Sequence, residues 1–230
     1  MAIVLNPKYE YEPLKRINSG GRLYVTPNGS SVPSVTTVLS ATADKTALIA
    51  WRNRVGNAEA DRISKESTNL GTLVHKHVEN HILGISRPSG NNEIHIIARK
   101  MSDLIIEQGL KDVNEVWGME ANLYSPNLYA GTTDLVGVYR QRPSIMDHKT
   151  AKKMKKTEWL EDYFIQTCAY AIAHNELYGT DIKQGVLFMA SREYEYSTFV
   201  IEGRDFEHYS NLWLERLDRY YTIMHSPVII

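Results

Sequence analysis

The chain of 230 residues contains one cysteine, Cys168, and no long hydrophobic run. A single thiol cannot form an internal disulfide, and it excludes zinc fingers and iron–sulfur clusters that need four thiolate ligands. No apolar run approaches the roughly 18 residues that a membrane span requires. The first residues, MAIVLNPK, also lack the features of secretory and organelle-targeting segments. We therefore expect a cytoplasmic protein that makes no contact with membranes.

Internal repeats, low-complexity tracts and long Pro/Gly linkers are also missing from the sequence. Hydrophobic residues make up 43% of the chain and charged residues 23%, which is typical of a globular protein and not of a disordered one. Chains of up to roughly 250 residues often fold as one unit. These properties predict a single domain over residues 1–230.

The chain has almost no net charge, with 26 basic and 27 acidic residues. Averaged in this way, the charge argues against binding to nucleic acid. The distribution is uneven, however: residues 1–70 carry 9 basic and 6 acidic residues, residues 147–156 carry 5 and 1, and residues 157–230 carry 5 and 12. The basic block reads DHKTAKKMKK. A lysine run alone is more often a solvated loop, so its meaning depends on the residues beside it.

Hydrophobic periodicity separates helical segments from strands along the chain. The expected helices cover residues 45–55, 58–66, 70–83, 94–108, 157–178 and 205–224. The expected strands cover residues 22–25, 113–123, 127–140, 144–149, 185–190 and 196–201. We also expect a turn at Arg142–Pro143 and a helix N-cap at Thr157. This order predicts an α/β or α+β fold around a mixed central sheet flanked by helices, preceded by a helical region over residues 34–84.

Two acidic residues lie in neighbouring expected strands, Asp134 in the segment GTTD and Asp147 in the segment DHKT. A hairpin would bring them together, and Lys149, two residues after Asp147, would point to the same face. Two carboxylates and an ammonium could bind a divalent cation and hold a water beside it. The alternative is an exposed turn with scattered charges.

Three further features strengthen the first interpretation. Gln166 and Tyr170 are four residues apart on an expected helix and therefore share one face. His75, in the segment GTLVH, opens a helix and could supply a neutral imidazole ligand, although a histidine alone is more often a hydrogen-bonded core or surface residue. Glu120 lies on the strand before Asp134, where a carboxylate could face the same place.

The segments GTLVH, GTTD, DHKT and QTCAY, in this order, resemble the RecB-like branch of the PD-(D/E)XK nucleases. That branch has the pattern GxxxH, GxxD, DxK and QxxxY. The early segment PSVTTVL and the arrangement of Trp51, Arg54-Val55-Gly56 and the GTLVH segment are further similar to the mitochondrial genome maintenance exonuclease family and its phage relatives. The resemblance spans about residues 33 to 220 and implies a restriction-endonuclease-like core.

The resemblance also implies roles for individual residues. Asp134 and Asp147 would bind one or two magnesium or manganese ions, with His75 as an additional ligand. Lys149 would activate or orient the attacking water, and Glu120 would be a further acid at the metal or the water. Gln166 and Tyr170 would hold the DNA strand. Relatives with an iron–sulfur cluster are excluded because Cys168 is alone.

DNA is the partner that the resemblance implies, and the sequence offers two basic segments for it. Arg52 and Arg54 lie in the helical region over residues 34–84, which would cover the DNA channel, and Lys152 and Lys153 lie in the basic block. Phosphates would be neutralised by these side chains. Trp51 and Trp159 could stack on bases, although both lie in amphipathic segments where a place in the core is favoured; these are the two tryptophans nearest the basic segments.

The implied function is a metal-dependent DNA exonuclease acting on single strands or free ends. It would serve replication, recombination or DNA degradation in a bacterium or a phage-infected cell. Two alternatives of the same enzyme class stay open, a duplex-specific recombination exonuclease and a structure-specific endonuclease. A third alternative is an inactive nucleic-acid-binding module of the same fold.

Overall fold

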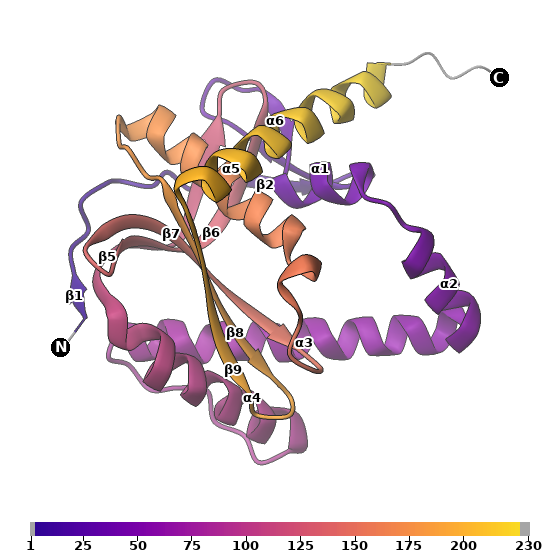
Figure 1. Ribbon diagram of the computed structural model, residues 1–230, viewed down its shortest axis with the longest axis vertical. Helices are drawn as coiled ribbons and strands as arrows, with labels where there is room; N and C mark the ends of the chain where they lie inside the picture. Colours follow the sequence, from indigo (N-terminus) through magenta and orange to yellow (C-terminus); the bar gives the residue numbers. More distant parts are fainter. Residues whose placement is uncertain (1–2, 226–230) are drawn as a thin grey trace.

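Residues 3–225 are described by a computed structural model, and their centre is a mixed sheet of six strands (Figure 1). The strand order is β1-β5-β6-β7-β8-β9. Neighbouring strands are antiparallel, except that β1 is parallel to β5 and β7 is parallel to β8. The strands are β1 (Val4–Leu5), β5 (Val113–Ser125), β6 (Tyr129–Tyr139), β7 (Arg142–Ala151), β8 (Gln184–Ser191) and β9 (Tyr196–Glu202). The expected mixed sheet is confirmed.

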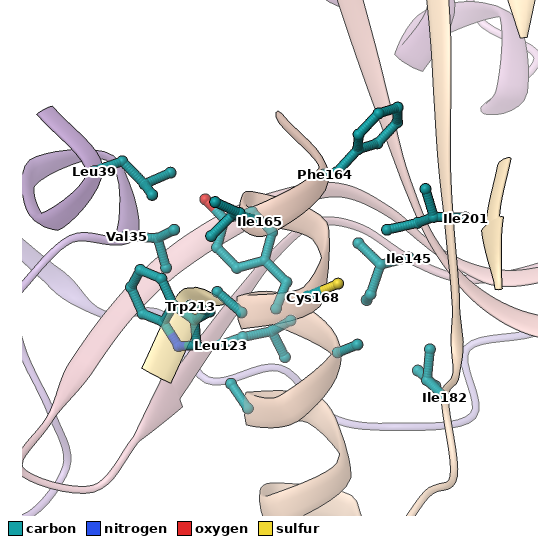
Figure 2. Close-up of a cluster of buried hydrophobic side chains, with 14 of the residues drawn as sticks. Val35, Leu39, Leu123, Ile145, Phe164, Ile165, Cys168, Ile182, Ile201 and Trp213 are labelled. Atoms are coloured by element: carbon teal, nitrogen blue, oxygen red, sulfur yellow. The ribbon is translucent and has the colours of Figure 1, made fainter. Parts of the chain in front are cut away.

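Helices cover both faces of the sheet, and each face has its own hydrophobic core. One core lies beneath α1 (Val35–Thr42), α5 (Glu161–Tyr178) and α6 (Gly203–His225), and Figure 2 shows its side chains grouped around α5. The other core lies beneath α3 (Asn57–Ile82), α4 (Glu93–Leu104), the π turn Ile105–Gly109 and the 3-10 turn Leu110–Asp112. Across residues 3–225, none of the helices has the length and apolar character needed to cross a membrane.

A second, three-stranded antiparallel sheet precedes the helices. It consists of β2 (Lys15–Asn18), β3 (Arg22–Val25) and β4 (Ser31–Pro33), so the expected strand over residues 22–25 is confirmed. Tyr24 of β3 is buried, and its hydroxyl lies 3.2 Å from Oγ1 of Thr132 on β6. The small sheet therefore packs against the strand that carries Asp134.

The helical region after α1 differs from the expectation of two separate helices over residues 58–66 and 70–83. α3 is one helix of 26 residues, preceded by α2 (Thr46–Val55). The polar stretch between the expected helices does not break it, because the hydroxyls of Thr68 and Thr72 donate to the carbonyls four residues earlier. Such bonds satisfy these side chains within a continuous helix.

α2 and the adjoining half of α3 form an arm that stands out from the sheet (Figure 1). α2 buries none of its side chains within the described chain, and residues 61–69 of α3 are likewise without a buried side chain. The second half of α3, from Leu70 on, packs on the sheet through Val74 and Val78. One continuous helix thus joins the arm to the core.

Two local expectations are wrong. The hairpin between β6 and β7 turns at Arg140 and Gln141, both with positive φ, and not at Arg142–Pro143. Pro143 can lie in β7 because the pairing with β8 begins only at Ile145, so its missing N–H leaves no gap in that ladder. Thr157 begins a 3-10 turn, Thr157–Trp159, and α5 itself starts at Glu161.

Candidate functional site

Strands β6 and β7 form the base of the site. Their pairing ends at Leu135 and Met146, and Asp134 and Asp147 are the next residues on the two strands. Oδ2 of Asp134 accepts a hydrogen bond of 2.7 Å from the backbone N–H of His148. The two acids therefore lie side by side, as the hairpin interpretation expected.

Lys149 extends this group toward α5. Its Nζ lies 2.5 Å from Oδ2 of Asp147 and donates a hydrogen bond of 3.2 Å to Oε1 of Gln166. Nε2 of Gln166 donates in turn to the hydroxyl of Tyr170 at 3.1 Å. Asp147, Gln166 and Tyr170 are all buried. The structure thus brings the residues of the DHKT and QTCAY segments into one chain of contacts.

The glycine of the GTTD segment allows α5 to come this close to β6. A Cβ atom on Gly131 would lie 2.6 Å from Cε1 of Tyr170, which is well inside van der Waals contact. Any larger residue would push the Tyr170 ring away and disturb the bond that Tyr170 makes with Gln166. Gly131 therefore serves the close approach of helix and strand at the site.

His75 reaches the same place from α3. Its Nε2 lies 2.9 Å from the backbone carbonyl oxygen of His148, so Nε2 carries a hydrogen and the carbonyl accepts it. Nδ1 of His75 lies 3.4 Å from Oδ1 of Asp134. A carbonyl that orients a histidine ring in this way is a common arrangement behind metal ligands. The ring presents Nδ1 to the carboxylate of Asp134.

Glu120 lies on β5 opposite Asp134, because the register pairs Met119 with Leu135 and Ala121 with Thr133. Its backbone has a φ of 46°, a left-handed conformation inside a strand. Such a conformation costs about 1–3 kcal/mol in a residue other than glycine, and inside a strand it is a signal of a functional site. His75, Glu120 and Asp134 each offer a ligand atom, and these atoms lie within 4.8 Å of one another.

The resemblance implied His75, Asp134 and Asp147 as metal ligands and Glu120 as a further acid at the metal or the water. In the structure Glu120 is the third member of the group, whereas the Oδ2 atom of Asp147 faces the ammonium of Lys149. β5 and β7 flank β6 on opposite sides, so Asp134 has an acid on each side.

The charges of the site are strongly coupled. Burial disfavours the charge of Asp134, but His75 outweighs it and holds the pKa of Asp134 below its usual range. Burial likewise disfavours the imidazolium of His75, yet the carboxylate of Asp134 raises the pKa of His75 to about 9. Desolvation and the charge of Asp134 raise the pKa of Glu120. Burial raises the pKa of Asp147, while the ammonium of Lys149 opposes that shift.

The arrangement fits a divalent cation. Carboxylate oxygens are the preferred ligands of magnesium and manganese, and manganese also accepts an imidazole nitrogen. Desolvation and mutual repulsion raise the pKa of Glu120 and Asp147, and a bound cation would relieve both. The donor set of two carboxylates and an imidazole therefore supports a metal site at His75, Glu120 and Asp134.

Two residues with a place at the site were given no role from the sequence. Glu79 follows His75 by four residues on α3 and lines the same small pocket as His75, Glu120 and Asp134. The spacing of four on a helix was the signal that could have found it. Tyr163 contacts the ammonium of Lys149, with the ring centroid 4.9 Å from Nζ. No sequence pattern pointed to it.

The four basic residues expected to bind DNA do not contact the metal-binding group. Arg52 and Arg54 lie on α2, where Arg52 is paired with Asp61 and Arg54 is exposed. Lys152 and Lys153 follow β7, and Nζ of Lys153 lies 3.1 Å from Oε1 of Glu193. Within residues 3–225, Arg54 and Lys152 form no ion pair, so these two carry their charge freely into solvent.

The tryptophans depart from the expectation that they belong to the core. Trp159 is 66% exposed in the 3-10 turn before α5, and Trp51 is half-buried on α2. Trp159 leaves the core because α5 begins only after it, at Glu161, so the amphipathic pattern was extended one turn too far. Trp213 of α6, by contrast, is fully buried.

Comparisons with known proteins show a resemblance to an exonuclease. A segment of 122 residues is 30% identical to mitochondrial genome maintenance exonuclease 1 of Xenopus tropicalis, covering 50% of this chain and 35% of that protein. The matched part thus spans about a third of the relative's length. No known protein-family profile matches the chain. The resemblance to nucleases that the four motifs indicated is confirmed.

Solved structures show the fold. A proposed exonuclease from Eubacterium rectale superposes with a TM-score of 0.51 at 12% identity, over 69% of this chain and 66% of that one. The alkaline exonuclease of Laribacter hongkongensis bound to dAMP gives a TM-score of 0.28 at 12% identity, over 66% of this chain and 82% of that one. The first similarity shows a shared mixed α/β fold, and the second is too low to add to it.

Proposed function

We propose that this chain is a metal-dependent DNA exonuclease that hydrolyses phosphodiester bonds of single strands or free ends. One observation carries the proposal: a possible cation site at His75, Glu120 and Asp134 lies beside a lysine held by a buried acid and a buried glutamine. The similarity to a mitochondrial genome maintenance exonuclease supports a nuclease activity in general.

Hydrolysis of a phosphodiester needs an oriented water and positive charge beside the phosphorus. A bound magnesium or manganese ion would acidify a water and offset the charge that develops on the phosphate. Lys149 is suited to orient the attacking water, because Asp147 and Gln166 hold its ammonium in place. Its charge persists in this setting: burial disfavours the ammonium, but Asp147 and Asp134 raise the pKa of Lys149.

Gln166 and Tyr170 line the side of the site formed by α5. Gln166 uses one donor on Tyr170 and its acceptor on Lys149, so its second N–H is available to a phosphate oxygen. We assign the two residues to holding the scissile strand. The rigid contact of Tyr170 with Gly131 supports that role, because a positioning group must itself be held in place.

The substrate path is proposed to run between the arm and the basic loop 152–156. Arg54 of the arm and Lys152 of the loop carry free positive charge, which phosphates neutralise. Trp159, beside the loop, offers an exposed ring on which a base can stack. We propose that the whole chain acts as one nuclease domain, with residues 34–84 covering the DNA, in DNA replication, recombination or degradation of a phage or bacterium.

The test is an assay with 5′- and 3′-labelled DNA, single- or double-stranded, in magnesium, in manganese and in chelator. We expect metal-dependent shortening of single strands from an end. Complete and persistent absence of cleavage in both metals would refute the enzyme and leave the inactive DNA-binding module.

The same assay separates the remaining enzymatic alternatives. Cleavage of a closed circular single strand would identify an endonuclease, since an exonuclease leaves it intact. Degradation of duplex ends faster than single strands would identify a recombination exonuclease. Each of these outcomes contradicts the proposed preference while leaving the metal site in place.

A further inference from the structure

Tyr163, in the first turn of α5, lies between two lysines. Its ring centroid is 4.9 Å from Nζ of Lys149 and 4.7 Å from Nζ of Lys155. Its hydroxyl accepts a hydrogen bond of 2.9 Å from Nζ of Lys155. Lys149 belongs to the candidate site and Lys155 to the basic loop, so this one side chain contacts both.

The contacts of Lys149 show what the ring adds. Asp147 and Gln166 hold the ammonium from two sides, and its side chain is only 17% exposed. The ring of Tyr163 provides the third contact. An ammonium is attracted to an aromatic face, and this attraction is stronger where water is largely excluded. Without the ring, a flexible four-carbon stem would be held by polar contacts alone.

The hydroxyl ties the ring to the loop. Lys155 is half-buried and donates to Tyr163, whereas Lys152 makes no ion pair in residues 3–225 and is exposed. The lysines of the loop therefore differ in what they touch. Lys152 is free to meet a phosphate, while Lys155 is committed to Tyr163.

We propose that Tyr163 is a positioning residue for Lys149, and that Lys155 holds Tyr163 in the orientation this requires. The inference rests on the proposed nuclease function for its kinetic consequence, but its structural part, the restraint of the Lys149 ammonium, does not. It separates the basic loop into a residue that acts on turnover, Lys155, and one that acts on DNA binding, Lys152.

The kinetic test compares Tyr163→Leu, which removes the ring, with Tyr163→Phe, which removes only the hydroxyl. We expect kcat on single-stranded DNA to fall about tenfold in Tyr163→Leu, with KM changed less than about twofold. Tyr163→Phe and Lys155→Met should each lower kcat by about threefold, and the double variant should be no worse than either alone. Lys152→Met should instead raise KM and leave kcat unchanged.

The matched control is Tyr194→Leu. Nζ of Lys100 on α4 lies 4.8 Å from the centroid of the Tyr194 ring in the β8–β9 turn, so this variant removes a lysine–tyrosine pair at nearly the same distance but away from the candidate site. We expect its kcat to equal that of the unmodified protein. Thermal unfolding of every variant is followed in parallel, so that a loss of fold is recognised. If Tyr163→Leu does not fold, the kcat values of Tyr163→Phe and Lys155→Met decide whether the inference holds.

A second readout needs neither metal nor DNA. The reaction of each lysine with an amine acylating reagent is measured by mass spectrometry in chelator, at one pH, relative to the exposed Lys183. We expect Lys149 to react several-fold faster in Tyr163→Leu and nearly as slowly as in the unmodified protein in Tyr163→Phe.

Unchanged reactivity of Lys149 in a folded Tyr163→Leu protein would overturn the inference. So would a Tyr163→Leu variant in which KM rises while kcat is preserved, since that would make Tyr163 a DNA contact. If the unmodified protein cleaves no DNA at all, the nuclease proposal fails, and the acylation result still decides whether Tyr163 restrains Lys149.

Discussion

Two regions differ in how their charged side chains are bound: the strands that carry the acids, and the arm formed by α2 and the adjoining half of α3. On β6 and β7, Asp134, Asp147 and Lys149 are each bound by a partner; Asp147 is buried and the other two are half-buried. On α2 no side chain is buried within the described chain, and Arg54 has no ion-pair partner there. A reaction that needs atoms held in fixed positions suits the strands, and contact with a nucleic acid of variable sequence suits the arm.

The largest expected effect is on the strand side of this comparison. Lys149→Ala should reduce DNA cleavage by at least about 100-fold, because a charge beside the developing phosphate charge is removed. DNA binding in chelator should stay within about twofold, since the arm and loop are untouched. Cleavage is measured under single-turnover conditions and binding by fluorescence anisotropy, with Lys183→Ala as the control. Full activity of Lys149→Ala would contradict the assignment.

Glu120→Gln should have the next largest effect, on metal affinity. This variant removes one charged ligand from the group of His75, Glu120 and Asp134. Manganese binding is expected to weaken by about 10–100-fold, because the affinity for a cation depends on the number of carboxylate ligands. Titration calorimetry measures this directly, and the metal concentration for half-maximal cleavage should rise in step. Glu115→Gln, on the same strand but outside the group, is the matched control. Equal manganese affinity in both variants would return the third position to Asp147.

Replacing Lys152 and Lys153 by glutamine tests the exposed side of the comparison. We expect weaker binding to single strands of every sequence, with a salt dependence whose slope falls by about one unit for each phosphate that is no longer neutralised. Lys153 should contribute less than Lys152, because it is already paired with Glu193. Cleavage of saturating DNA should be nearly unchanged. A fall in that rate larger than the loss of binding would place these lysines in the chemistry.

The smallest effect is expected from Trp159→Ala. Stacking of one base on an aromatic ring contributes about 1–3 kcal/mol, so binding of single strands should weaken by about tenfold. The free energy of unfolding should change by less than about 0.5 kcal/mol because the ring is 66% exposed. Trp213→Ala, at a fully buried ring, should lower the free energy of unfolding by about 3–5 kcal/mol. Equal unfolding midpoints for the two variants would contradict this difference.

The sequence predicted the parts of the fold that rest on periodicity and missed those that rest on exact boundaries. The alternation over residues 127–140 and 144–149 indicated neighbouring strands, and β6 and β7 confirm it. The break expected near Thr68 was wrong, because hydroxyl-to-carbonyl bonds within a helix leave no mark in composition. The helix N-cap expected at Thr157 was wrong for a related reason, since a 3-10 turn and an α-helix have nearly the same sequence pattern.

The candidate site was predictable where residues two or four apart share a face. Asp147 and Lys149, and likewise Gln166 and Tyr170, contact each other as their spacing indicated. Glu120 was expected near Asp134 from its place on the preceding strand, but its left-handed backbone conformation was not signalled by its residue type. The contact of Tyr163 with Lys149 arises only when α5 and β7 pack together.

The left-handed conformation of Glu120 has a consequence for anyone who would redesign this chain. An L-residue held at a φ of 46° is less stable there than glycine by about 1–3 kcal/mol, so Glu120→Gly should relax the strand while deleting a carboxylate. Selection for thermal stability alone would therefore favour glycine at this position, and the carboxylate would be lost. In the proposed nuclease, stability and metal binding would then compete for the same residue, and a library screened only for heat resistance would select against the Glu120 carboxylate.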